Sequence, residues 1–151
     1  MPRKVLFLCT GNSARSQMAE ALLRKHGGSA YEAYSAGLAP KPIHPFTVKV
    51  LEEVGNDISG HYSKNVKDYM GRMRFDDAVI VCRRFDEDCP TIYADARAIH
   101  RWLFDDPALA TGTDEEVLAV FQSTRDQIEA RIKLWLAEVE EAKRPEAGAR
   151  P

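Results

Sequence analysis

The sequence has no long apolar segment and no excess of positive charge. Its longest uninterrupted apolar runs, among them residues 5–9 and 78–82, are five residues long, which is too short for a membrane span or for the core of a signal peptide. Its 21 basic residues are outnumbered by 23 acidic ones, which gives a formal net charge of −2 and no positive field to hold DNA or RNA. We therefore expect a cytoplasmic protein with neither membrane nor nucleic acid among its partners.

Cysteine is also scarce. The three cysteines, Cys9, Cys82 and Cys89, are an odd number in a chain without a secretion signal, which argues against a structural disulfide framework. Zinc ligands usually occur in pairs roughly two to four residues apart, a spacing that neither the later cysteines nor His100 provide. The sequence therefore favours inert or reactive thiols over a metal site.

The remaining composition is that of one soluble globular domain. The 151 residues fit a single domain of roughly 100–200 residues, and a content of 44% hydrophobic and 29% charged residues excludes collagen-like and disordered classes. Buried-looking strands alternate with helical patterns, which predicts an α/β domain of three layers, with a central, mostly parallel four-stranded sheet flanked by helices. The predicted strands are residues 5–9, 31–36, 78–82 and 99–104, and the predicted helices after the first strand are 18–27, 45–54 and, weakly, 66–74.

The last third of the chain carries the clearest helical pattern. Thr113 and Glu116 form a capping box, and apolar residues then recur with a 3.6-residue period as far as Val139. The helix should end near Ala142, which closes a domain of residues 1–142. Residues 143–151 combine proline, glycine, alanine and charge, and we expect them to be a disordered tail.

The loop after the first strand has the features of an oxyanion-binding nucleophile site. Cys9 ends the strand, and Arg15 follows six positions later where a helix begins. Small residues between them allow backbone N–H groups to point inward beside the helix N-terminus, while the arginine offers a planar fork for two oxygens. The predicted loop comprises Thr10, Gly11, Asn12, Ser13, Ala14, Arg15 and Ser16.

The same positive surroundings favour a thiolate at Cys9, which we predict to be the nucleophile. Taken alone, Cys9 would be interpreted as a buried strand residue and Arg15 as a solvated helix residue. The combination of strand, small-residue turn, spacing and helix favours the functional interpretation.

The loop resembles that of the low-molecular-weight tyrosine phosphatase fold family. Its arsenate reductase branch is the most similar, through Cys9-Thr10-Gly11-Asn12-Ser13 and Arg15-Ser16-Gln17-Met18-Ala19-Glu20. Phosphatases of this fold usually have proline at the position of Gln17. The resemblance covers nearly all of the chain before its tail, through Tyr34-Ser35-Ala36-Gly37, Asp57-Ile58-Ser59 with His61, and Phe104-Asp105-Asp106-Pro107-Ala108.

The sequence departs from this family at two positions. Ala14 replaces a second loop cysteine that many relatives have. Lys64 replaces an aspartate that, in some members, holds potassium together with residues matching Asn12, Glu20 and Ser35. A lysine ammonium would take the place of that cation, so we expect no bound potassium.

Groups that follow three different predicted strands should meet at one rim. Ligands of open α/β sheets bind outside the carboxyl ends of the strands, where Cys9, Cys82 and Asp106 are all placed. Asp106, before Pro107, matches the general acid of the family, whereas an isolated Asp-Pro would more often form a turn or start a helix. Asp105 is given only that structural role, and we treat the four histidines as surface or structural residues: His26, His44, His61 and His100.

The resemblance implies reduction of arsenate to arsenite by three cysteines. In such a reaction Cys9 attacks arsenic, Cys82 attacks Cys9 and releases arsenite, and Cys89 attacks Cys82, which leaves a Cys82–Cys89 disulfide for thioredoxin. Arg15 and the loop would hold the oxyanion, and Asp106 would protonate the departing hydroxide. No metal or organic cofactor is implied, and phosphate or sulfate should compete for the loop.

Two other functions remain open from the sequence. A low-molecular-weight protein tyrosine phosphatase would use the same loop, with water attacking the adduct on Cys9. A thiol sensor would bind an oxyanion or a partner without turnover. Taken alone, Cys82 would be an apolar strand end and Cys89 an incidental surface thiol.

Overall fold

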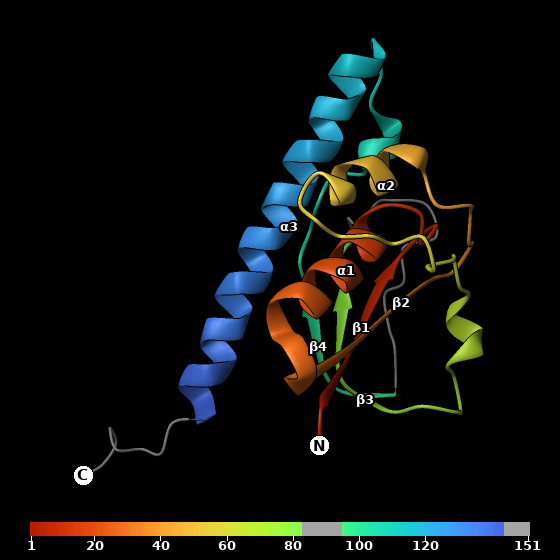
Figure 1. Cartoon of the computed structure of the whole chain (residues 1–151). Helices are drawn as coiled ribbons and strands as arrows, with labels where there is room; N and C mark the ends of the chain where they lie inside the picture. Colours follow the sequence, from red (N-terminus) through yellow and green to blue (C-terminus); the bar gives the residue numbers. More distant parts are fainter. Residues whose placement is uncertain (83–94, 144–151) are drawn as a thin grey trace.

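Four parallel strands form the centre of the structure, a computed structural model that describes residues 1–82 and 95–143. They pair in the order β2-β1-β3-β4 (Figure 1). Their bounds are β1 (Arg3–Cys9), β2 (Tyr31–Gly37), β3 (Phe75–Ile80) and β4 (Ala96–Arg101). β1 has a parallel neighbour on each side, which explains its continuous apolar run. The predicted α/β domain with a four-stranded sheet is therefore confirmed, and every strand pairing in it is parallel.

In the described part of the chain, three helices pack against one another beside this sheet. They are α1 (Arg15–Gly27), α2 (Pro45–Glu52) and α3 (Asp114–Lys143), joined by the short 3₁₀ turns η1 (Gly28–Ala30), η2 (Val66–Asp68) and η3 (Pro107–Leu109). α1 packs on β1 and β2 and contacts α3 (Figure 1). Within residues 1–82 and 95–143, no helix combines the length and the apolar character that crossing a membrane requires.

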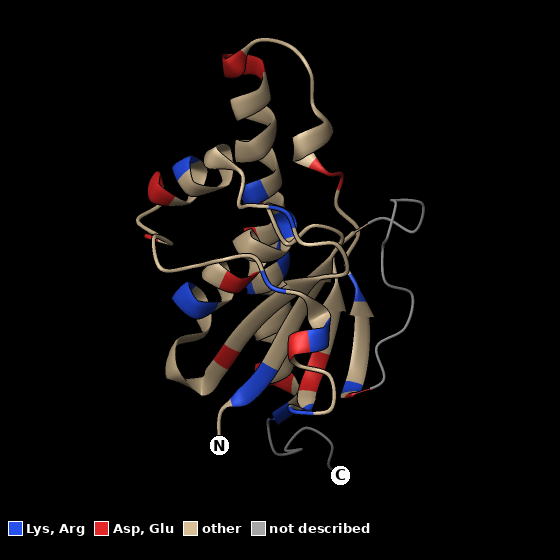
Figure 2. Cartoon of the chain, turned by 90° about the vertical axis from the view of Figure 1, so that its right-hand side faces the viewer, with Lys and Arg blue, Asp and Glu red and all other residues tan. Residues whose placement is uncertain are grey.

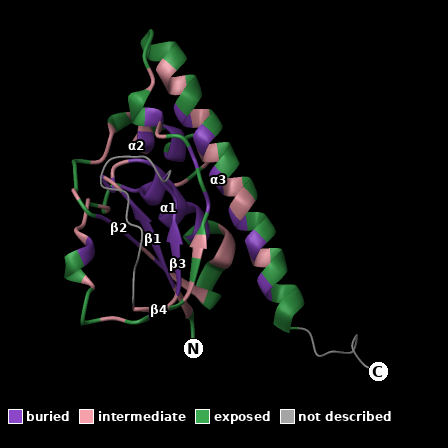
Figure 3. Ribbon diagram, turned by 180° about the vertical axis from the view of Figure 1, so that it is seen from behind, coloured by how far each residue is buried: buried purple, intermediate pink, exposed green. Residues whose placement is uncertain are grey.

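The long helix α3 begins at the predicted capping box. Thr113 Oγ1 accepts a hydrogen bond from the backbone N of Glu116 (3.1 Å), and Glu116 Oε1 accepts one from the backbone N of Thr113 (2.9 Å). One stripe of the helix is buried (Figure 3), and it follows the predicted 3.6-residue period. The stripe consists of Phe121, Thr124, Ile128, Ile132, Trp135 and Val139. Basic and acidic residues are interspersed along the described elements (Figure 2).

Several predicted boundaries were wrong. Residues 66–74 form only the turn η2, and Tyr69 beyond it packs its ring against Tyr34 and Phe75. The strand predicted at 99–104 is β4, which begins at Ala96 and ends at Arg101. Its residues alternate between half-buried and exposed because it lies at the edge of the sheet. An edge strand of this kind has no continuous apolar run by which the sequence could reveal it. Similarly, the strand predicted at 78–82 is β3, which begins at Phe75 and ends at Ile80.

Two predictions fall partly or wholly outside the described residues. The predicted tail begins at Lys143, which is the last residue of α3, and residues 144–151 are not described. Cys89 lies in the undescribed range 83–94.

A buried carboxylate joins three strands at the end of the sheet opposite Cys9. Asp77 of β3 accepts hydrogen bonds from Arg3 Nε of β1 (2.7 Å) and from His100 Nε2 of β4 (2.8 Å). Its side chain is fully buried, and Trp135 of α3 lies against both basic partners. Burial alone would raise the pKa of Asp77, but the hydrogen bonds from His100 and Arg3 outweigh it and hold the pKa below its ordinary value.

Replacing Asp77 with asparagine should lower the free energy of unfolding by about 2 kcal/mol at neutral pH, because it removes the charged acceptor of the hydrogen bonds from half-buried Arg3 and His100. The pKa of Asp77 is lower in the folded chain than in the unfolded chain. The contribution of Asp77 to the free energy of unfolding is therefore complete above the pKa of an aspartate in the unfolded chain, about 3.9. It is lost as the pH falls through the lower pKa of Asp77 in the folded chain.

Urea denaturation of both proteins from neutral pH down to about pH 3 measures this effect, and the difference between them should shrink below about pH 4. Asp76→Asn is the matched control, because Asp76 is half-buried and accepts the backbone N of Lys4, a bond that asparagine keeps. If Asp77→Asn were as stable as the unmodified chain at neutral pH, this role of Asp77 would be wrong.

Candidate active site

The loop between β1 and α1 directs hydrogen-bond donors at the sulfur of Cys9. Cys9 Sγ accepts a hydrogen bond from the backbone N of Asn12 (3.2 Å) and lies 2.8 Å from Ser16 Oγ at the start of α1. Asn12 has a φ of 52°, in the left-handed region that asparagine adopts more readily than most residues. This turn points its N–H into the loop, as the sequence predicts for an oxyanion nest.

The side chain of Asn12 holds the loop in this conformation. It is fully buried, and its Nδ2 donates to Ser16 Oγ (2.8 Å). Its Oδ1 accepts hydrogen bonds from Gln17 Nε2 (3.0 Å) and from the backbone N of Lys64 (2.8 Å). Because Ser16 Oγ already accepts from Asn12, its own hydrogen is available to the sulfur of Cys9.

The chain after β2 lies over the loop at very close range. Thr10 O accepts the backbone N of Ala39 (3.0 Å), and Gly11 O accepts that of Lys41 (2.8 Å). A Cβ atom at Gly37 would lie 2.6 Å from Thr10 O and 2.9 Å from Asn12 N. Glycine is therefore required at this position, because any side chain would push the end of β2 off the loop.

The loop, the start of α1 and the turn after β4 enclose a cavity of about 150 Å³. Arg15 is almost completely buried, its Nη1 donates to Phe104 O (3.0 Å), and its Nη2 lies 3.5 Å from Asp106 Oδ2. Asp106 Oδ1 caps η3 by accepting the backbone N of Ala108 (3.0 Å). The cavity is lined by Cys9, Thr10, Gly11, Ser13, Ala14, Arg15, Lys41, Asp106, Ala108 and Leu109.

The structure thus brings together Cys9, Arg15 and Asp106, as the strand order predicted. Thr10 Oγ1 is buried and makes no hydrogen bond within the described part of the chain. A larger hollow of about 590 Å³ lies at the opposite end of the sheet, beside Arg3, Asp76 and Arg97. None of the predicted site residues lines that hollow.

Cys82 leaves the sheet at the same edge as Cys9. The backbone N of Val81, the residue after β3, donates to Leu8 O of β1 (2.9 Å), so the chain is still paired beside the end of β1 when it reaches Cys82. Cys82 is fully buried. It precedes the undescribed range 83–94.

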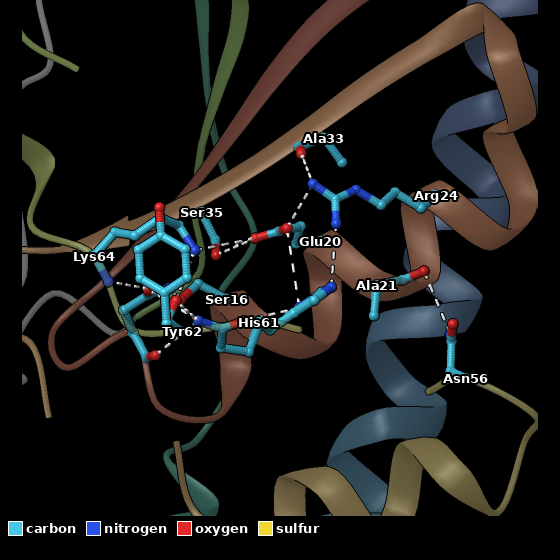
Figure 4. Close-up of polar contacts among 12 residues, drawn as sticks. Ser16, Glu20, Ala21, Arg24, Ala33, Ser35, Asn56, His61, Tyr62 and Lys64 are labelled. Carbon is cyan, nitrogen blue, oxygen red and sulfur yellow. Dashed lines mark hydrogen bonds and ion pairs between the residues drawn. The ribbon is translucent and has the colours of Figure 1, made fainter. Parts of the chain in front are cut away.

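A buried carboxylate lies behind the loop, on α1 (Figure 4). Glu20 Oε1 accepts a hydrogen bond from Ser35 Oγ (2.5 Å), and Glu20 Oε2 pairs with Arg24 Nη2 (2.8 Å). Lys64 Nζ lies 3.7 Å from Glu20 Oε1 and donates to the backbone O of Tyr62 (2.8 Å). The ammonium therefore lies beside Glu20, one of the residues that the resemblance implies for a cation site. Burial lowers the pKa of Lys64, although the charge of Glu20 opposes this.

Gln17 has a structural role that the sequence did not reveal. It is fully buried, and its Nε2 donates to the backbone O and Oδ1 of Asn12 and to the backbone O of Tyr62. In the sequence, Gln17 was noted as a departure from the phosphatase pattern. Its position as a polar residue in the first turn of a buried helix was a second signal that could have indicated this role. The histidines make structural contacts: His26 with Glu129, His44 with the backbone N of Phe46, His61 with Gln17, and His100 with Asp77.

Comparisons with known proteins identify similar sequences and structures over most of the chain. A sequence model described as low molecular weight phosphotyrosine protein phosphatase matches residues 4–145. A curated protein of Halalkalibacterium halodurans named arsenate reductase is 43% identical over 136 residues, which cover 89% of this chain and 96% of that protein.

Two solved structures have the same fold. One is described as an arsenate reductase in the phosphate binding state. It has a TM-score of 0.71 and 28% identity, and the match covers 90% of this chain and 98% of that one. The other is a thioredoxin-dependent arsenate reductase of Corynebacterium glutamicum. Its TM-score is 0.68 at 28% identity, over 94% of this chain and 64% of that one.

Proposed function

Since the chain belongs to the low molecular weight phosphotyrosine protein phosphatase family, we propose that it reduces arsenate to arsenite through the thiols of Cys9, Cys82 and Cys89, with thioredoxin as the reductant. The observation that carries this proposal is the cavity in which Cys9, Arg15 and Asp106 meet. The name arsenate reductase, borne by relatives that match most of the chain, supports the choice of substrate. The thioredoxin-dependent protein of Corynebacterium glutamicum supports the choice of reductant.

The size and lining of the cavity fit an inorganic tetrahedral oxyanion. Pockets for drug-sized ligands usually measure roughly 300–1,000 Å³, whereas this cavity measures about 150 Å³. Its small size is suited to arsenate, with phosphate and sulfate as competitors.

In the first step the Cys9 sulfur attacks arsenic while an arsenic–oxygen bond breaks. The departing hydroxide takes a proton from Asp106 and leaves as water. Asp106 Oδ1 is occupied by the backbone N of Ala108, so Oδ2, which lies 3.5 Å from Arg15 Nη2, is the oxygen that faces the reaction. An oxyanion bound to Arg15 competes for this contact and directs Oδ2 toward the leaving group.

In the second step the electrons come from thiols. The Cys82 sulfur attacks the Cys9 sulfur, the sulfur–arsenic bond breaks, and its electron pair reduces arsenic, which leaves as arsenite. The Cys89 thiolate then attacks Cys82, displaces the Cys9 thiolate and leaves a Cys82–Cys89 disulfide. The dithiol of thioredoxin reduces this disulfide by exchange. The position of Cys82 beside the end of β1 supports its attack on Cys9.

Replacing Asp106 with asparagine should lower the rate of arsenate reduction by about 10²–10⁴-fold, the usual contribution of a general acid. Asparagine keeps the cap of η3 but supplies no carboxylic proton. Stopped-flow measurement of the first turnover tests this step separately from regeneration. Asp105→Asn is the control and should react at the unmodified rate. If Asp106→Asn reduced arsenate as fast as the unmodified chain, Asp106 would not be the general acid.

A coupled assay tests the function as a whole. The reduced chain is incubated with arsenate, thioredoxin, thioredoxin reductase and NADPH, and the oxidation of NADPH is followed by absorbance. We expect sustained oxidation that requires arsenate, thioredoxin and the chain together. Steady phosphate release from an aryl phosphate without arsenate reduction would instead identify a phosphatase. Oxyanion binding without either turnover would identify a sensor.

A further inference from the structure

Lys41 places a cation at the cavity that no step of the proposed reaction uses. It lines the cavity together with Cys9, Arg15 and Asp106. Lys41 itself is exposed. Within residues 1–82 and 95–143 its ammonium has neither a hydrogen bond nor an ion pair. Within these residues, the charge of Lys41 is therefore not neutralised by a structural ion pair.

The backbone holds Lys41 firmly at this position. Pro40 and Pro42 stand on either side of it, and each proline restricts the backbone of the segment. The backbone N of Lys41 donates to Gly11 O (2.8 Å), while its backbone O accepts a hydrogen bond from Ser63 Oγ. Both polar backbone atoms of Lys41 are thus fixed, one of them directly to the oxyanion loop.

The side chain of Lys41 extends over the same loop. A Cβ atom built on Gly11 would lie 3.6 Å from Lys41 Cδ and 3.7 Å from Lys41 Cβ, so the aliphatic stem lies close over Gly11 of the loop. A stem held along the loop needs to lose little further freedom to bring its ammonium to a ligand in the cavity.

The charges around the cavity explain why a second cation is useful. Arg15 already pairs with Asp106 Oδ2 at 3.5 Å and donates to Phe104 O, so its charge is shared before an oxyanion arrives. An incoming dianion also meets the carboxylate of Asp106 and the sulfur of Cys9, which repel it when charged. Lys41 is the lining cation that has no carboxylate partner among the described residues.

We propose that Lys41 is a further substrate-binding residue of the oxyanion site, whose ammonium pairs with a doubly charged tetrahedral oxyanion and strengthens its binding. This deepens the proposed function and rests on it for the identity of the substrate. The charge of the bound oxyanion is present both before and during the attack by Cys9. The contact therefore contributes equally to ground-state and transition-state binding, which changes KM and leaves kcat nearly unchanged.

The test compares Lys41→Met, which keeps the stem and removes the charge, with Lys41→Arg, which keeps the charge. Lys49→Met on α2 is the control, because Lys49 is also exposed and lies outside the lining of the cavity. Binding of inorganic phosphate is measured by titration calorimetry at low and high salt. Steady-state arsenate reduction gives kcat and KM for each variant.

We expect Lys41→Met to weaken phosphate binding and to raise the arsenate KM by about tenfold at low salt, with kcat within about twofold. High salt should reduce the difference, because it screens an exposed charge. Lys41→Arg should bind phosphate almost as well as the unmodified chain, and Lys49→Met should bind it equally well.

Phosphate binding by Lys41→Met that equals that of the unmodified chain at low salt would overturn the inference, as would a loss of kcat at unchanged phosphate affinity. A failure of the proposed function is distinguishable from both results. In that case the unmodified chain would bind phosphate in a Lys41-dependent way without reducing arsenate.

Discussion

Replacing Cys9 with serine should abolish arsenate reduction and any hydrolysis of aryl phosphates, because both reactions require a covalent adduct on the sulfur of Cys9. A serine hydroxyl is a far weaker nucleophile without a general base. The loop itself should persist, because an oxygen at this position can still accept hydrogen bonds from the backbone N of Asn12 and from Ser16.

Phosphate binding provides the control for this variant. Cys9→Ser should still bind phosphate through Arg15 and the backbone N–H groups of the loop, as calorimetry can measure. A variant that binds phosphate and yields no product in either assay separates the loss of chemistry from a loss of folding. More than trace turnover in either assay would place the nucleophile elsewhere.

The two later cysteines should differ from each other when each is replaced by serine. Cys82→Ser should release no arsenite, because it lacks the thiol that attacks the adduct on Cys9. Cys89→Ser should release about one arsenite per molecule and then stop with Cys9 joined to Cys82, because that disulfide cannot be transferred onward. Arsenite released per molecule, measured with thioredoxin present, distinguishes the two results.

These two variants are also controls for each other. Any phosphatase activity should survive in both, since water rather than a second thiol cleaves a phosphoryl adduct. Sustained multiple turnover by Cys89→Ser would contradict the relay of three thiols. Equal loss of reductase and phosphatase activity in Cys82→Ser would show that the change had damaged the oxyanion loop.

The central strands and the first loop could be predicted because their patterns are local. An apolar run that ends in a small-residue turn predicts a strand buried on both faces, and it also places Cys9 at the rim. Sequence order alone then brings Asp106 to the same rim, because parallel strands end at one edge. The structure confirms that Arg15 and Asp106 line one cavity with Cys9.

The features that the sequence did not reveal depend on contacts between distant segments. β4 has an alternating burial pattern at the sheet edge, so the apolar residues after it, Trp102 and Phe104, marked the strand in the wrong place. Gln17 and Lys41 acquire their positions from Asn12 and Gly11, and only the packing of the chain after β2 onto the loop brings Lys41 there. No local period encodes such a contact.

A disulfide map after a single turnover tests most directly whether the three cysteines form one thiol relay. The fully reduced chain is mixed with one equivalent of arsenate without thioredoxin, free thiols are alkylated, and arsenite and linked peptides are quantified by mass spectrometry. We expect about one arsenite per molecule, with Cys9 alkylated and Cys82 joined to Cys89. Arsenite formed while Cys82 and Cys89 both remain reduced, or no arsenite at all, would contradict the relay.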